Sequence, residues 1–318
     1  MKRFTLSFLM IILSSFFIFG QTILVVDRDG SADLGFTDCW PAFQAALDAN
    51  SYTYTYYEVT DVTLDGPDLT TMQAHDIIIW FTGEGWQNGQ TMTDNDETNL
   101  STFMDDGGML FFSGQDFLWD RWSSAGVFSA GDFPYDYFGL REVSQDIWYI
   151  DATGTMDGVA GSLAEGMTFT LQDIFTTDKD GLFIDEMVNH VGISLFNITD
   201  PAPEGIGAVQ YELRGHKAVF TTASFAAIVD PGNQATLMAA IIGYFTGAPP
   251  PPPAPCENFD ALTVGGYVAG QLGGLWTTWS GAPGTAEDAI VTDTFSVSPD
   301  NSFVVEGTTD LVKLFADE

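Results

Sequence analysis

The chain has 318 residues, of which 44 are acidic and 9 are basic, giving a formal net charge of -35 at pH 7. Such a charge repels nucleic acid and anionic lipid and excludes both as partners. Hydrophobic residues make up 45% of the chain and aromatic residues 14%, so we expect it to fold rather than remain disordered.

The first residues have the three parts of a secretory signal peptide. Lys2 and Arg3 form a short basic region, an almost wholly apolar stretch covers residues 4–19, and Gly20 is the small residue that signal peptidase needs. A membrane-spanning helix requires roughly 20 apolar residues, and this stretch is shorter. We therefore expect residues 1–20 to be cleaved and the mature protein to be secreted or held at the cell surface, with no later membrane span.

A run of prolines divides the remaining sequence. Residues 248–256 predict a stiff polyproline II linker. It separates an α/β domain at residues 21–247 from a piece at 257–318. The second piece has no helical period, and its short aromatic and β-branched runs, at Tyr267-Val268, 275–279 and 303–305, predict strands of a truncated β-sandwich or jelly roll. Within it, Trp276 and Trp279 are expected to serve mainly in core packing.

The two cysteines leave the disulfide state open. An even number of cysteines after a signal peptide suggests a disulfide. However, Cys39 falls in an expected helix and Cys256 follows the proline-rich linker. A partner beyond the end of this chain is an alternative for Cys256.

The first domain reads as alternating strands and helices. Apolar or β-branched runs predict strands at 23–26, 54–59, 77–81 and 109–112. Between the first two strands, Trp40, Phe43 and Leu47 recur at helical spacing, with Thr37 as the expected cap. Before the fourth, Thr93 and Asp96 resemble a capping box, and Gly107 and Gly108 end that helix.

The remaining elements of the domain continue the same α/β architecture. Residues 208–213 and 218–223 predict a hairpin, and Asp230-Pro231 opens a final helix. Residues from about 121 to 205 read as an insertion of loops and short strands. The order of elements implies a parallel sheet with helices on both faces, in a doubly wound, flavodoxin-like layout.

Polar side chains gather where the expected parallel strands end, the edge at which such sheets bind ligands. They follow the first, third and fourth strands: Asp27, Asp29, Glu84, Trp86, Ser113, Gln115, Asp116 and Asp120. Together they could bind a cation or a sugar. Alternatively, they cap helices and solvate loops. The stretch from Asp27 to Gly30 lacks the third acid and spaced glutamate of a calcium hand, so no cofactor is expected, although calcium stays open.

Four stretches together resemble the class I glutamine-amidotransferase-like domains of secreted, multidomain bacterial proteins. They are "ILVVDRDG", "PDLTTMQAHDIIIWFTGEGW", "TDNDETNLSTFMDDGGMLFFSGQD" and "HKAVFTTASFAAI". The stretch beginning "CENFDALTVGGY" resembles the start of concanavalin-like or MAM-like jelly rolls in secreted Bacteroidetes proteins. Such proteins often end in a sorting signal for type IX secretion, which is not visible here.

The resemblance also implies what a catalytic member needs. A cysteine stands on the sharp turn after the fourth strand, and a histidine and a glutamate follow a late strand; the thiolate attacks the amide and the histidine transfers its proton. This chain has Ser113-Gly114-Gln115-Asp116 at the turn and Ser224-Phe225-Ala226-Ala227 after the late strand. Amidotransferase activity is therefore not expected.

If Ser113 were a nucleophile in place of the missing cysteine, it would need a base beside it. His75 and His216 precede strands and should lie at the opposite edge of the sheet, and His190 falls in the insertion. We therefore expect a non-catalytic binding or scaffold module of a secreted or surface protein, with a glycan or a surface protein as candidate partner. The alternatives are a hydrolase, through Ser113 with His190 or through a metal in the acidic crevice, and an accessory domain of a secreted peptidase.

Overall fold

A computed structural model describes residues 21–123, 126–175, 181–213, 215–247, 259, 262–272, 276–293 and 302–313. The chain divides into two compact units, Met1–Pro251 and Pro252–Glu318. The expected signal peptide, the proline-rich linker and Cys256 lie outside the described residues. None of the described helices combines the length and the hydropathy that a membrane crossing requires.

A nine-stranded sheet forms the centre of the first unit, in the order β2-β1-β3-β4-β11-β10-β9-β6-β7. Its first five strands are parallel and have the 2-1-3-4-5 order of a flavodoxin-like fold. The last four strands join antiparallel. The strand bounds are β1 (Ile23–Asp27), β2 (Tyr54–Glu58), β3 (Ile77–Phe81), β4 (Met109–Ser113), β6 (Thr153–Gly158), β7 (Thr168–Gln172), β9 (Ile193–Asp200), β10 (Gly205–Leu213) and β11 (His216–Thr221).

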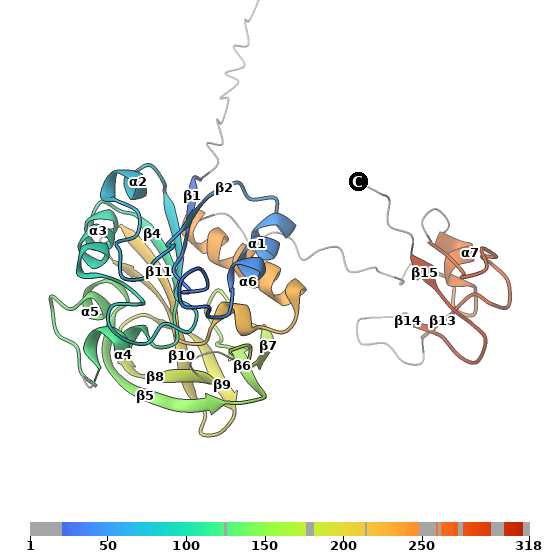
Figure 1. Ribbon diagram of the computed structural model, residues 1–318. Coiled ribbons are helices and arrows are strands. Elements are labelled where there is room, and N and C mark those ends of the chain that lie inside the picture. Colours follow the sequence, from blue (N-terminus) through green and yellow to red (C-terminus); the bar gives the residue numbers. More distant parts are fainter. Residues whose placement is uncertain are drawn as a thin grey trace, which may run out of the picture. The chain divides into compact units, whose positions relative to one another are not determined.

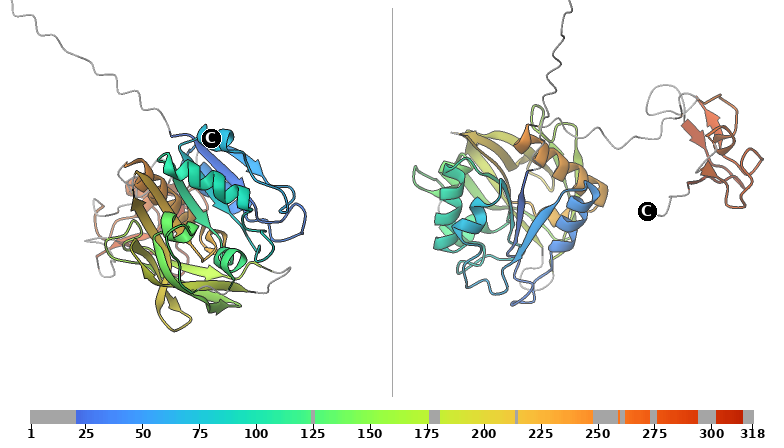
Figure 2. Two further views of the ribbon diagram at one scale, coloured as in Figure 1. Left: turned by 90° about the vertical axis from the view of Figure 1, so that its left-hand side faces the viewer. Right: turned by 90° about the horizontal axis from the view of Figure 1, so that it is seen from above.

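Helices cover both faces of the parallel part (Figures 1 and 2). Ile77 and Ile79 of β3 belong to the core on one face, with α1 (Trp40–Ala49) and α6 (Pro231–Thr246). Ile78 and Trp80 belong to the core on the other face. That face is covered by α2 (Leu69–Gln73), α3 (Asp94–Asp105), α4 (Phe117–Trp122) and α5 (Phe133–Tyr137). Burial on both faces explains why β3 is continuously apolar.

Local sequence chemistry fixes several element ends as expected. Thr93 and Asp96 form both bonds of the predicted capping box. Asp230 caps α6 by accepting the backbone N–H of Asn233 at 3.0 Å. The prediction that Thr37 caps α1 is wrong, because Cys39 occupies the cap position and the Thr37 hydroxyl donates to the carbonyl of Ile174.

The region expected to be an insertion contributes more strands to the main sheet than predicted. Strands β6, β7 and β9 extend that sheet in antiparallel fashion, which corrects the expectation of a parallel sheet closed by a single hairpin. The burial of β7 alternates residue by residue, as in a strand covered on one face only. Such a pattern is weaker in sequence than the long apolar runs of β1 and β3, which explains why these strands read as loops and short strands.

The remaining strands of this region, β5 (Leu140–Ile150) and β8 (Leu182–His190), pair with each other in a separate antiparallel sheet. This small sheet meets the edge at which β4 and β11 end (Figure 1). The backbone N–H of Phe183 donates to Oε1 of Gln115 at 3.4 Å, and the hydroxyl of Thr222 donates to the carbonyl of Asp185 at 3.1 Å. The insertion therefore covers part of the carboxyl edge.

The described part of the second unit has one short helix and two two-stranded sheets, β12 with β15 and β13 with β14. Its elements are α7 (Val268–Leu272), β12 (Trp276–Thr277), β13 (Ile290–Thr292), β14 (Ser302–Val304) and β15 (Val312–Lys313). Two expectations are corrected. Val268 begins a helix rather than a strand, and Trp279 is 86% exposed because it lies in the turn after β12. Trp276 is half-buried and packs edge-on against Phe259.

Candidate functional site

The carboxyl edge of the parallel strands brings the predicted site residues to one side of the sheet. Asp27 of β1 pairs in register with Phe81 of β3, and Phe81 pairs with Ser113 of β4. Neighbouring strands are about 4.8 Å apart, so the Cα atoms of Asp27 and Ser113 are separated by roughly 10 Å. The loops after β3 and β4 carry the other predicted residues to the same edge.

Two buried carboxylates stand at the end of β1, and each accepts hydrogen bonds from a neighbouring segment of the chain. Asp27 accepts the hydroxyl of Tyr56 at 2.8 Å. Asp29 accepts the backbone N–H groups of Ser31 at 2.8 Å and Cys39 at 2.7 Å. These bonds attach the start of α1 and the edge strand β2 to the end of β1.

A third carboxylate, which is not among the predicted site residues, joins this pair. Oxygen atoms of Asp27, Asp29 and the exposed Asp38 all lie within 4.8 Å of one another. Carboxylate oxygens are the ligands that hard cations such as calcium prefer. Asp38 could have been anticipated, because it stands just before α1 and helices that follow parallel strands begin at this edge.

Burial, more than the neighbouring charges, favours protonation of Asp27 and Asp29. Burial, followed by the charge of Asp29, raises the pKa of Asp27 to about 7. Burial also raises the pKa of Asp29. The pKa of the Cys39 thiol lies well above its usual value, because the side chain is buried and faces Asp29 and Asp27. Cys39 is therefore held as an unreactive thiol rather than as a thiolate.

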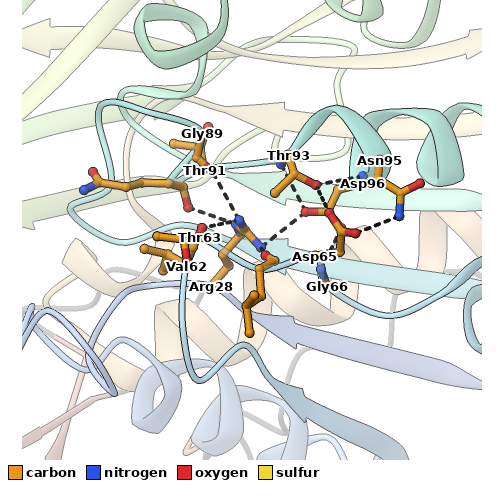
Figure 3. A network of polar contacts seen from close by, with 12 residues as sticks. Arg28, Val62, Thr63, Asp65, Gly66, Gly89, Thr91, Thr93, Asn95 and Asp96 are labelled. Carbon is orange, nitrogen blue, oxygen red and sulfur yellow. Dashed lines mark hydrogen bonds and ion pairs between the residues drawn. The ribbon is translucent and has the colours of Figure 1, made fainter.

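Arg28, which lies between the two aspartates in sequence, does not neutralise them. Its guanidinium forms an ion pair with Asp96 at 3.2 Å, and both side chains are fully buried (Figure 3). The other guanidinium bonds go to four backbone carbonyls, those of Val62, Leu64, Gly89 and Gln90. Arg28 thus connects the loops after β2 and β3 to β1, a role that was not predicted from the sequence.

Acids in the loop after β3 and in α4 also bind backbone. Glu84 accepts the N–H of Thr37 at 2.8 Å. Asp120 accepts the N–H groups of Gly89 and Thr91, each at 2.9 Å. Trp86, in the same loop, donates its backbone N–H to the side chain of Gln90. These contacts match the alternative reading in which the acids organise loops.

The turn after β4 is closed rather than open. Ser113 is 3% exposed, and its Oγ accepts the backbone N–H of Phe225 at 3.0 Å. Gln115 and Asp116 are buried as well. Of the eight predicted residues, only Trp86 and Asp120 are partly exposed. The expected crevice is therefore largely filled by side chains and by the β5–β8 sheet.

The histidines lie away from this turn. His75 precedes β3 and His216 begins β11, so both stand at the amino edge, as predicted. His190 ends β8, seven residues beyond Phe183, the residue that contacts Gln115. At about 3.3 Å per residue, this places His190 roughly 20 Å along the strand. Its ring nitrogens contact the carbonyl of Gly192 and the hydroxyl of Ser194, and the structure does not bring it to Ser113.

No protein-family model and no curated protein matches this sequence. Solved structures with similar chains include a β-galactosidase from Rahnella sp. R3, with 12% identity, a TM-score of 0.45, and coverage of 72% of this chain and 32% of that one. A putative ThuA-like protein from Parabacteroides merdae has 9% identity, a TM-score of 0.43, and coverage of 71% and 90%. This chain thus spans about a third of that β-galactosidase, and we carry no function over from either protein.

Proposed function

We propose that residues 21–247 are a non-catalytic module of an exported multidomain protein, serving in binding or as a scaffold beside other domains. The observation that carries this proposal is the state of Ser113. Its hydroxyl is buried and accepts a hydrogen bond from Phe225, and the described residues place no histidine or carboxylate in bonding contact with that hydroxyl. A neutral serine hydroxyl without a base is a poor nucleophile.

The residues after β11 support the same proposal. This is the position at which the resemblance to amidotransferase-like domains would place a histidine and a glutamate. Here residues 222–227 are Thr-Ala-Ser-Phe-Ala-Ala, and Phe225–Ala227 form a short 3-10 helix. Phe225 packs its ring against Phe43 and Phe111, so this segment contributes to the core.

Export and the multidomain context rest on the sequence. The basic, apolar and small-residue order of residues 1–20 supports secretion, and the proline-rich linker supports a second domain, for which we propose the start of a concanavalin-like or MAM-like jelly roll of the Bacteroidetes type. The partner would be a glycan or a surface protein, or a secreted peptidase that this module accompanies. N-terminal sequencing of the mature protein should begin at Gln21, and a start at Met1 would contradict export by cleavage.

An activity assay tests the non-catalytic proposal against the hydrolase alternative. Purified protein should not hydrolyse glutamine or simple esters, with or without added calcium or zinc. The added metals address the three neighbouring carboxylates of Asp27, Asp29 and Asp38. Turnover that Ser113→Ala abolishes would establish a serine hydrolase, and metal-dependent turnover that Asp29→Asn abolishes would establish a metal-dependent one.

A further inference from the structure

A cavity of about 410 Å³ opens at the amino edge of the sheet, on the opposite side from Ser113. It is lined by the end of α3, by α5, by the start of β5, by the last residue of β10 and by the first residue of β11. The residues that matter here are Arg141, Tyr135, Tyr137, Tyr211, His216 and Asp105. Its volume lies within the range of about 300–1,000 Å³ that is usual for small-molecule sites.

Arg141 is a fixed cation in this cavity. One guanidinium nitrogen, Nη1, donates to the carbonyls of Tyr135 at 3.0 Å and Leu140 at 2.9 Å. The guanidinium also stacks on the Tyr135 ring, 3.4 Å from its centre. These contacts fix the plane of the group and leave Nε and Nη2 without a protein acceptor among the described residues. Two parallel donors on a fixed guanidinium match the two oxygens of a carboxylate.

The charge of the chain makes this arginine unusual. Among the described residues, Arg28 and Arg121 both form ion pairs with acids, whereas no acid lies within 4.0 Å of Arg141. In a chain with a net charge of -35, an arginine without an acidic partner is a natural place for an anionic group of a ligand.

The rest of the lining restricts what that ligand can be. Asp105 and Asp136 are among the lining residues, and their negative charges would repel a dianion such as a phosphate ester. Tyr137 and Tyr211 are largely buried, and their rings contact the His216 ring, with centroids 5.5 and 5.9 Å away. Among the described residues, the lining therefore combines one arginine, two aspartates, a histidine and an aromatic wall.

We propose that this cavity binds a free α-amino acid with an aromatic or large apolar side chain. Its carboxylate pairs with Arg141, its ammonium group is held by the carboxylates of Asp105 and Asp136, and its side chain packs against the tyrosines. A zwitterion of this size satisfies both signs of charge, which an anion or a cation alone does not. This inference does not depend on the function proposed above, because it concerns the other edge of the sheet.

Isothermal titration of the full chain with L-phenylalanine tests the proposal. We expect saturable binding to one site, and binding at least about tenfold weaker, a difference of about 1.4 kcal/mol, for N-acetyl-L-phenylalanine and for L-phenylalaninamide. Each of these probes lacks one of the two charges. No binding of L-phenylalanine up to about 10 mM, or equal binding of the amide, would overturn the proposal.

Variants locate the site. Arg141→Gln should weaken L-phenylalanine binding by at least about tenfold, whereas Arg121→Gln, which changes an arginine outside the cavity, should leave it unchanged. Because Arg141 also holds two backbone carbonyls, Asp105→Asn provides a second variant at an exposed position that is expected to preserve the fold. It should weaken binding of L-phenylalanine more than binding of the amino-blocked probe. Unchanged affinity in both variants would refute the assignment.

Discussion

The Oγ atom of Ser113 accepts a hydrogen bond from the backbone N–H of Phe225, at 3.0 Å and out of contact with solvent. The bond links the turn after β4 to the segment after β11, the two places where the resemblance to amidotransferase-like domains would put a nucleophile and a base. Here they are joined by a structural contact. The hydroxyl therefore acts as a buried acceptor that holds two neighbouring turns together.

Ser113→Ala should consequently lower stability. Removing the acceptor leaves the buried N–H of Phe225 without a partner, which costs about 1–2 kcal/mol. Urea denaturation should show this loss in the free energy of unfolding with an unchanged m-value. Ser129→Ala, at an exposed serine, is the control and should change stability by less than about 0.5 kcal/mol. Unaltered stability of Ser113→Ala would mean that the hydrogen bond is not formed.

The parallel part of the fold could be predicted from sequence because its strands are buried on both faces. Such strands are continuous apolar runs, as in Ile77–Phe81. The capping box at Thr93 and the cap at Asp230 were likewise correct, since each depends on residues three apart. The antiparallel strands β6, β7 and β9 were not placed in the main sheet, because strand pairing depends on contacts distant in sequence.

The sequence predicted at which edge of the sheet the candidate site residues lie, but it did not predict how deeply they are buried. All eight residues lie at the expected edge, yet sequence gives no measure of how much the loops and the β5–β8 sheet cover them. Arg28 shows the difficulty most clearly. Its position between Asp27 and Asp29 suggests local neutralisation, whereas its partner is Asp96, 68 residues away in the chain.

That long-range ion pair makes Arg28 a sensitive point for stability. Arg28→Met leaves the Asp96 carboxylate buried without its cation and four carbonyls without their donor. Breaking a buried pair in this way typically costs about 3–5 kcal/mol. We expect a loss of this size in chemical denaturation, with part of it recovered in the double variant Arg28→Met/Asp96→Asn.

Arg121→Met is the matched control for Arg28→Met. Arg121 pairs with Asp94 and Glu97, and the side chains of these three residues are 17%, 95% and 24% exposed, whereas those of Arg28 and Asp96 are fully buried. Contact with solvent screens the Arg121 pairs, so their contribution should lie closer to that of surface ion pairs, about 0–1 kcal/mol. A similar loss of stability in Arg121→Met and Arg28→Met would show that burial of the Arg28 pair has no energetic consequence.

The fragment of residues 21–247 should fold without the remainder of the chain. It contains both large hydrophobic cores, one on each face of the nine-stranded sheet. Among the residues that the structure describes in the second unit, the buried core consists of Val268, Ala289 and Val291 with a few partly buried neighbours, which is too little for independent stability. Thermal unfolding of residues 21–247 should be cooperative, with the midpoint of the longer chain. Dispersed, protected amide signals from residues 257–318 alone would contradict the second half of this prediction.

The pKa of Asp27 predicts how stability changes with pH. The value is about 7 in the folded protein, against an ordinary value of 3.8. Between these two pH values the folded protein therefore holds a proton that the unfolded chain has released. The free energy of unfolding must then fall as the pH rises from about 4 to 7, and the contribution of protonated Asp27 is lost above that range.

Asp27→Asn removes this dependence, because the amide is neutral at every pH and its oxygen can still accept the hydroxyl of Tyr56. A tenfold change in proton affinity corresponds to about 1.4 kcal/mol, and the pKa of Asp27 rises by about three such steps, so the variant should be more stable than the wild type by up to about 4 kcal/mol at pH 8. The difference should vanish at pH 4. Asp38→Asn, at the exposed member of the same acidic group, should change stability much less at pH 8. Urea denaturation in the presence of EDTA makes this comparison.

If Asp27→Asn were instead less stable than the wild type at pH 8, and the wild type gained stability from added calcium, the ionised carboxylate of Asp27 would be serving as a cation ligand.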